Sequence, residues 1–187
     1  YYIGTANGIV SFREKESDLN GSPYSSTDTF EEQDYSGMMG SWTLHFAYLD
    51  VTSIQVTPRK AYGLSEGAIF SVNREDEAVQ YYNRLGGLSD ANIASIHYDD
   101  LTAQLLILYA NGNIDLMNDD GDVWNIADLK IKQLSGTSKV ANSVRMHNGY
   151  AYLAMPFGIM QVNLRRHEIA DTYYIGPEGA DLNVEAV

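Results

Sequence analysis

A short pattern of strand, glycine turn and strand recurs along the chain and restricts the folds open to it. The pattern occurs around Gly8, Gly67, Gly112 and Gly158. A tight hairpin needs a residue at positive φ, which glycine adopts without a steric penalty. The last three turn glycines are separated by 112 − 67 = 45 and 158 − 112 = 46 residues, room for four short strands and their turns. The sequence therefore predicts an all-β propeller of four-stranded antiparallel blades, with about four blades in this chain.

Two further strands flank each of the later hairpins. One set, at 51–57, 93–98 and 140–146, precedes the hairpins, and a second set, at 78–83, 123–126 and 169–175, follows them. Inner strands such as 105–108 are apolar on both faces, which is expected where blades pack face to face. Helical periodicity is absent.

The ends of the chain carry incomplete units. Residues 1–12 have the pattern of a hairpin, 42–49 that of a fourth strand, and 181–187 that of a first strand with no hairpin after it. We expect 41–180 to hold three blades and the strand before them, and the two termini to share one split blade, because either end alone would leave an unpaired edge. The domain is then either a closed ring or part of a larger propeller.

Residues 13–40 interrupt the repeat with a Ser/Gly-rich stretch that contains seven acidic residues. This composition predicts a solvated loop or a linker. The alternative is an acidic docking segment that becomes ordered on binding.

Composition excludes several classes of function. The chain has 25 acidic and 12 basic residues and a formal net charge of −13, which disfavours nucleic acids and anionic lipid surfaces as partners. No apolar run approaches the roughly 18 residues of a transmembrane helix. The absence of cysteine excludes disulfides and thiolate metal sites. No leader precedes Tyr1, so the sequence neither indicates nor excludes export.

Carboxylates and histidines give weak signals for a catalytic or metal site. The string Asn118-Asp119-Asp120-Gly121-Asp122 has closely spaced oxygens that suit Ca²⁺, but Asp120-Gly121 between two strands favours a hairpin turn. The histidines, at positions 45, 97, 147 and 167, lack the short spacing of a zinc site. Most other acidic residues lie in turns, and no nucleophile motif is present. We expect no catalytic residue, no metal and no cofactor.

Two tyrosine pairs are the candidate contacts for a partner or a glycan. Tyr81-Tyr82 and Tyr173-Tyr174 fall in corresponding outer strands, where alternation should turn one member of each pair inward and the other outward. Exposed aromatic rings stack on sugars and anchor protein partners. The alternative is that these tyrosines only favour the strand conformation.

Several strings resemble a known family. They are Gly87-Leu88-Ser89-Asp90, then 109–116 with Asn-Gly-Asn-Ile-Asp-Leu, then 168–176 with Asp-Thr-Tyr-Tyr-Ile-Gly. Over residues 40–176 the chain resembles the N-terminal β-propeller of the PorZ family of type IX secretion components in Bacteroidetes. The Gly-x-Trp at 40–42 usually lies near the mature N-terminus in that family, whereas 39 residues precede it here. Residues 3–8 also resemble the propellers of periplasmic two-component sensors.

The resemblance implies a non-catalytic, exported protein of the periplasm or outer-membrane surface. Proteins of the family help to process or anchor secreted cargo and are linked to a sortase partner and to anionic lipopolysaccharide. The expected role is a scaffold or recognition domain that binds protein partners or a surface glycan. The alternatives are a ligand-sensing propeller of a hybrid two-component regulator and, third, a propeller glycoside hydrolase or lyase.

Overall fold

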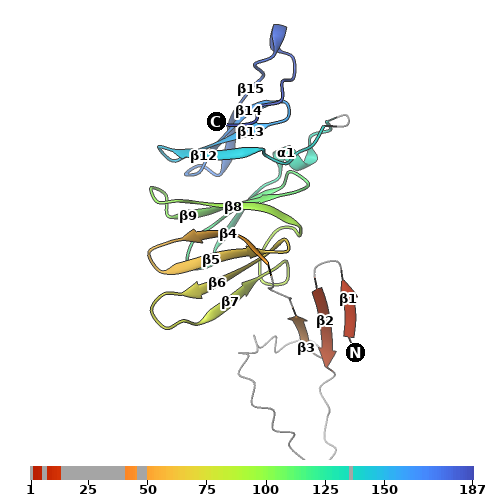
Figure 1. Ribbon diagram of the computed structural model, residues 1–187, viewed down its shortest axis with the longest axis vertical. Coiled ribbons are helices and arrows are strands. Elements are labelled where there is room, and N and C mark those ends of the chain that lie inside the picture. Colours follow the sequence, from red (N-terminus) through yellow and green to blue (C-terminus); the bar gives the residue numbers. More distant parts are fainter. Residues whose placement is uncertain (1, 6–7, 14–40, 46–49, 135–136) are drawn as a thin grey trace, which may run out of the picture. The chain divides into compact units, whose positions relative to one another are not determined.

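A computed structural model describes residues 2–5, 8–13, 41–45, 50–134 and 137–187 (Figure 1). Two compact units, Tyr1–Ala47 and Tyr48–Val187, make up the chain.

The first unit is a small antiparallel sheet. Its strands are β1 (Tyr2–Thr5), β2 (Gly8–Arg13) and β3 (Ser41–His45), in the order β1-β2-β3. The hairpin expected within 1–12 is β1 and β2, and the strand expected within 42–49 is β3. The predicted linker, 13–40, lies outside the described residues except for Arg13, which ends β2.

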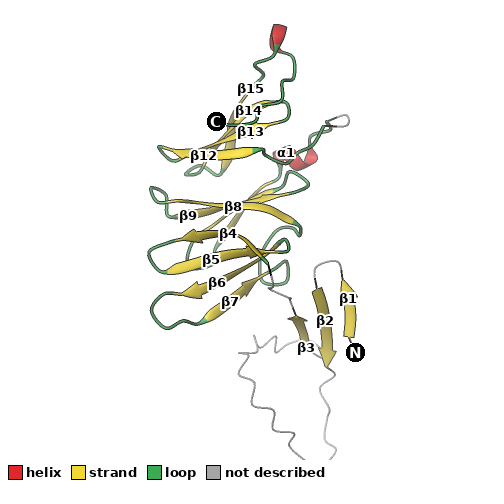
Figure 2. Ribbon diagram, in the orientation of Figure 1, coloured by secondary structure: helices red, strands yellow, loops and turns green. Residues whose placement is uncertain are grey.

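The second unit contains three four-stranded sheets, which confirms the propeller blades predicted from the repeat (Figure 2). Within each sheet, every strand pairs antiparallel with the next strand along the chain. Blade 1 consists of β4 (Val51–Val56), β5 (Lys60–Ser65), β6 (Ala68–Asn73) and β7 (Val79–Tyr82). Blade 2 consists of β8 (Ile93–Asp99), β9 (Gln104–Tyr109), β10 (Ile114–Met117) and β11 (Val123–Ile126). Blade 3 consists of β12 (Ser143–His147), β13 (Tyr150–Met155), β14 (Gly158–Asn163) and β15 (Glu168–Tyr173).

Turn geometry follows the predicted glycines. Gly67, Gly112 and Gly158 have φ angles of 77°, 86° and 146°. A turn that we did not single out from the sequence, Asn148-Gly149, joins β12 to β13 with φ angles of 53° and 80°. Two successive positive φ angles are the signature of a two-residue hairpin of type I′.

Two expected strand limits are wrong by more than one residue, and both errors have the same cause. β12 begins at Ser143 instead of residue 140, and β15 ends at Tyr173 instead of residue 175. Ser143 pairs with Ala154, next to the end of β13, and Tyr173 pairs with Ile159, next to the start of β14. A strand stops where its partner stops, because the ladder hydrogen bonds end there.

Two single-turn helices also occur, where the sequence indicated none. They are α1 (Asp128–Ile131) and the 3₁₀ turn η1 (Pro177–Gly179). One turn is too short to produce a helical period in the sequence. No helix among the described residues is long and apolar enough to cross a membrane.

Blade 2 shares a hydrophobic core with each neighbour. Leu105 and Ile107 of β9 belong to the core shared with blade 1, and Leu106 and Leu108 to the core shared with blade 3. Since successive residues of a strand point to opposite faces, β9 is apolar throughout, as predicted. Each blade interface is therefore a separate packed layer.

The predicted first strand at 181–187 is not a strand in the structure. Its backbone bonds to the last residue of β13 and to side chains, and it forms no ladder with a neighbouring strand. The Val184 amide donates to the Met155 carbonyl at 3.1 Å, and Asn142 Nδ2 donates to the Val184 carbonyl at 2.7 Å. The Ile93 amide makes a similar bond to the Gly67 carbonyl at 3.1 Å, where blade 1 crosses to blade 2. The pairing of residues 181–187 with the N-terminal hairpin stays a prediction.

Candidate functional site

The tyrosine pair of blade 1 alternates as expected. Tyr82 is 4% exposed, and its hydroxyl accepts a hydrogen bond from Lys60 Nζ at 3.0 Å and donates one to Gln80 Oε1 at 3.1 Å. Its ring packs 5.8 Å from the ring of Tyr62. Tyr81, on the opposite face, is 37% exposed. Burial therefore leaves Tyr81, and not Tyr82, accessible to a partner.

The tyrosine pair of blade 3 does not alternate. Tyr173 and Tyr174 are 43% and 37% exposed, because β15 ends at Tyr173 and Tyr174 lies beyond the ladder. The cross-strand register also shows that the two tyrosine pairs are offset by one residue relative to each other. Tyr82 is opposite Ile69 and Tyr173 is opposite Ile159, so the first tyrosine of one pair corresponds to the second tyrosine of the other.

Exposed apolar residues characterise the face of blade 1 that carries Tyr81. Ile54, Gly63, Phe70 and Tyr81 form one row across the four strands. The next row is Val56, Ala61, Val72 and Val79. Such a face has the composition of a packing surface, which favours a packing role for Tyr81.

The face of blade 3 that carries Tyr173, which corresponds to the Tyr82 face of blade 1, is polar. Here Tyr152, Gln161 and Tyr173 form a hydrogen-bonded chain that we call the tyrosine row. Gln161 Nε2 donates to the Tyr152 hydroxyl at 2.9 Å, and the Tyr173 hydroxyl donates to Gln161 Oε1 at 3.1 Å. Partial desolvation and the negative charge of Asp171 raise the pKa of Tyr173. The row therefore presents neutral aromatic rings with an amide between them.

Two of the strings that resembled a family, 87–90 and 109–116, contribute to a network at blade 2 that sequence reasoning did not foresee. The Asp90 carboxylate accepts hydrogen bonds from Lys130 Nζ at 2.7 Å and from Asn111 Nδ2 at 2.6 Å. Burial alone would raise the pKa of Asp90, but the bonds from Lys130, Asn111 and the Ala91 amide outweigh it and lower that pKa to about 2. The carboxylate joins the 83–92 crossing to the β9–β10 turn and to α1.

Asp115 forms the buried half of the same network. Its side chain is fully buried and accepts bonds from the Tyr109 hydroxyl at 2.6 Å, the Ser89 amide at 2.8 Å and Asn125 Nδ2 at 2.8 Å. Burial, followed by the bond to Asp115, raises the pKa of Tyr109. Every oxygen of the carboxylate is satisfied by the fold, so this cluster is structural.

The acidic string 118–122 forms a turn, as predicted. Asn118 Oδ1 accepts the amides of Asp120 and Asp122, and Gly121 has a φ of 93°. Asp119 reaches blade 1, where it accepts bonds from the Thr57 hydroxyl at 2.9 Å and the Tyr62 hydroxyl at 3.0 Å. These carboxylates already have protein partners. In the part of the chain that the structure describes, no three His, Asp or Glu side chains are grouped to hold a metal.

Two of the histidines with described side chains, His147 and His167, make local contacts. His167 stacks on Trp124 with ring centres 4.6 Å apart, and its Nε2 lies 2.9 Å from Gln104 Nε2. This contact joins the β14–β15 turn to blade 2. Burial lowers the pKa of His97 and of His167.

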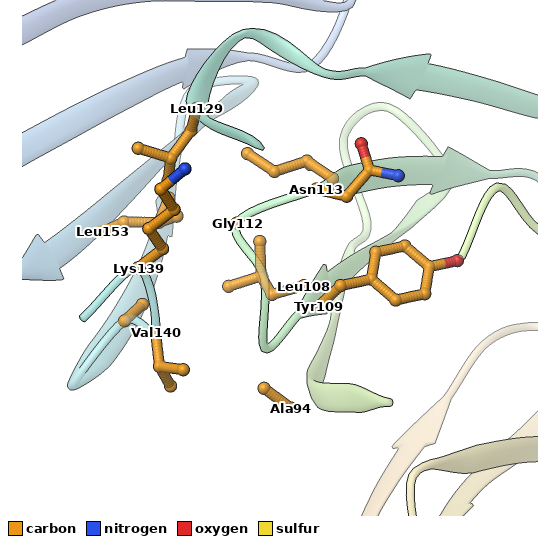
Figure 3. Close-up of a pocket in the computed structure, with 11 residues that line it drawn as sticks. Ala94, Leu108, Tyr109, Gly112, Asn113, Leu129, Lys139, Val140 and Leu153 are labelled. Atoms are coloured by element: carbon orange, nitrogen blue, oxygen red, sulfur yellow. The ribbon is translucent and has the colours of Figure 1, made fainter. Parts of the chain in front are cut away.

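A small cavity lies between blades 2 and 3 (Figure 3). Its volume is about 10 Å³, and Leu108, Leu129, Val140 and Leu153 line much of it. That volume suits a single water molecule. A small-molecule ligand does not fit in this cavity.

Comparison with protein families identifies the fold. Residues 61–186 match the family described as "TSS9, PorZ, N-terminal beta-propeller domain". The chain belongs to this PorZ family. The match covers all three blades apart from β4, and it confirms the resemblance found in the sequence.

Solved structures agree with the PorZ assignment. A structure of PorZ from Porphyromonas gingivalis, described as an essential bacterial surface component of the type IX secretion system, is 31% identical with a TM-score of 0.62. The similarity covers 66% of this chain and 16% of that one. The crystal structure of AztD from Citrobacter koseri shares the fold alone, with 11% identity, a TM-score of 0.50 and coverage of 98% of this chain and 46% of that one. No curated protein sequence matches the chain significantly.

Proposed function

We propose that this chain is a non-catalytic scaffold and recognition domain of an exported surface component of the type IX secretion system. Its membership of the PorZ N-terminal propeller family carries the proposal. The similar Porphyromonas gingivalis protein is described as an essential surface component of that system. The proposed location is the periplasm or the outer-membrane surface.

The tyrosine row is the surface that we propose for contact with a protein partner or a cell-surface glycan. Tyrosines supply large, rigid contact area at low entropic cost, and the amide of Gln161 supplies directional hydrogen bonds. Tyr173 has the largest exposure of the four tyrosines in the two pairs. Tyr174 takes part in a different cluster, where its hydroxyl accepts a hydrogen bond from Lys132 Nζ.

Gene deletion in the source organism tests the role in secretion. Deleting the full-length gene should stop the release of type IX cargo into the medium, and the intact gene should restore it. Normal release from the deletion strain would refute the proposed role. Regulated expression of unrelated genes, without a secretion defect, would favour the two-component sensor instead.

Two substitutions in the full-length protein test the surface. We expect Tyr173→Ala to weaken release or partner capture about tenfold, the usual scale for loss of an aromatic anchor. Arg166→Gln serves as the control, because Arg166 is exposed on the same blade and pairs only with Glu168 among the described residues. Equal effects of the two substitutions, at equal protein levels, would exclude the tyrosine row as the contact surface.

A further inference from the structure

Three lysines, one isoleucine and one tyrosine form a patch beside α1. We call this set the lysine patch: Lys130, Ile131, Lys132, Lys139 and Tyr174. The side chain of Ile131 is 76% exposed, more than any other large apolar side chain that the structure describes. An apolar side chain in water beside several cations is a feature that neither the fold nor the proposed function explains.

Lys132 is held in place by Tyr174. Its Nζ donates to the Tyr174 hydroxyl at 2.6 Å and lies 5.3 Å from the centre of the tyrosine ring. The Tyr174 ring lies 6.4 Å from the ring of Phe157, which is 1% exposed. The ammonium group is therefore fixed on a platform anchored in the core shared by blades 2 and 3.

Lys139 is also held in place. Its Nζ donates to the Lys130 carbonyl at 2.7 Å. Its aliphatic stem lies against Gly112, where an added Cβ would come within 2.8 Å of Lys139 Cδ. Figure 3 shows this side chain next to Leu129 and facing the β9–β10 turn.

The charges of Lys132 and Lys139 are not compensated. Both ammonium groups bond to neutral oxygens, and across the described residues neither takes part in an ion pair. Lys130, by contrast, pairs with Asp90 at 2.7 Å. A free lysine side chain has considerable rotamer entropy, and here that entropy is already lost before any ligand binds. The two cations are thus pre-organised for an anionic ligand.

The net charge of the whole chain indicates which kind of anionic ligand the lysine patch can bind. A formal net charge of −13 repels an extended anionic surface. Recognition of an anionic membrane usually needs four to eight clustered basic residues, more than this patch contains. A short acidic peptide segment would contact only the lysines of the patch. An apolar residue next to the carboxylates of that segment would cover Ile131.

We propose that the lysine patch binds a short acidic segment of a protein partner. Carboxylates of that segment pair with Lys132 and Lys139, and an apolar side chain packs on Ile131. The tyrosine row takes no part, so this proposal can fail while the scaffold role stands.

Fluorescence anisotropy with the full chain tests the proposal. The probe is a labelled peptide of alternating glutamate and leucine, and its control has glutamine in place of glutamate. We expect saturable binding of the glutamate peptide only. Replacing Lys132 and Lys139 together by Gln should weaken binding about fivefold to tenfold, the effect of losing two exposed ion pairs. Ile131→Ser should weaken it about threefold or more, through the lost apolar contact.

Arg165→Gln combined with Arg166→Gln is the matched control, because it removes two adjacent cations from the β14–β15 turn. Its affinity for the peptide should stay within about twofold of that of the unaltered chain. Lack of saturable binding, or equal loss in the arginine variant, would overturn the proposal. Lysine-dependent binding to phosphatidylglycerol vesicles that the peptide does not displace would also overturn it, in favour of a lipid ligand.

Discussion

Gly112 and Gly121 have similar backbone angles and very different surroundings. Their φ angles are 86° and 93°. A Cβ at Gly112 would lie 2.8 Å from Lys139 and 3.1 Å from Leu129, whereas a Cβ at Gly121 would have no heavy atom within 4 Å. Gly121→Ala should lower the free energy of unfolding by about 1 kcal/mol, through left-handed backbone strain alone. Gly112→Ala should lower it by about 2 to 4 kcal/mol, because overpacking adds to that strain.

Urea denaturation of the two variants measures this difference. Equal losses of stability would mean that the stem of Lys139 moves aside at no cost. In that case Lys139 would not be held as tightly as its contacts indicate.

Asp90 should make the fold sensitive to acid. Its pKa is 3.8 in an ordinary environment and about 2 in the folded chain. The unfolded chain therefore takes up the proton first as the pH falls. The stabilisation, up to about 2 kcal/mol, is fully present above pH 4 and is lost as the pH falls toward 2. Urea midpoints measured from about pH 5 to about pH 3 should fall further for the unaltered chain than for Asp90→Asn. Parallel curves would contradict the role of Asp90.

At the scale of elements, the β10–β11 turn provides a test that needs no substitution. Asp119 bonds to Thr57 and Tyr62, and Asp120 pairs with Arg59 at 2.7 Å. Since these carboxylates are engaged by the protein, we expect EDTA to leave the thermal midpoint unchanged. A drop of several degrees that Ca²⁺ reverses would instead identify the turn as a calcium site.

The same turn joins two blades. Asp119→Ala should lower the free energy of unfolding by about 2 kcal/mol, because it removes the acceptor of the buried Tyr62 hydroxyl and leaves the Thr57 hydroxyl with only the Lys60 carbonyl at 3.2 Å. Asp122→Ala is the matched control, since Asp122 is exposed and its side chain bonds to Asn118 within the turn. Thermal or urea denaturation of both variants gives the comparison, and equal destabilisation would argue against a bond between blades at Asp119.

Strand positions could be predicted from the sequence because they depend on local signals. Turn glycines and alternating apolar residues mark them within the repeat. The start of β12 and the end of β15 could not be predicted in this way, since each depends on where a partner strand stops. The correspondence of Tyr82 with Tyr173 also escaped prediction, because it requires the cross-strand register and not only the spacing along the chain.

At the scale of the whole molecule, substitutions at neighbouring residues of β9 should destabilise different blades. Leu106 and Ile107 are both fully buried but belong to different cores. Leu106→Val should speed amide hydrogen exchange mainly in blade 3, and Ile107→Val mainly in blade 1. Each should lower the free energy of unfolding by about 1 kcal/mol. Identical exchange patterns would mean that the three blades open as one unit.

The candidate sites were harder to predict than the fold. The tyrosines were visible in the sequence, but burial separates Tyr81 from Tyr82, and burial depends on how blades stack. Lys132, Lys139 and Tyr174 come together only because the crossing from blade 2 passes the end of β15. Residues distant in sequence and joined by irregular segments leave no periodic signal.

Within each blade, every strand pairs with the next strand along the chain, and this topology affects the order in which the protein folds. A blade forms without closing long loops, because its strands are neighbours in the sequence. Each strand added during folding therefore costs only a small amount of chain entropy. A blade has all its ladder partners as soon as its fourth strand emerges, and the next blade can then grow on its apolar face. Such an order of assembly shortens the time during which unpaired strand edges are exposed to aggregation. For a chain proposed to be exported, sequential pairing lets folding proceed from the N-terminal to the C-terminal blade, one blade at a time.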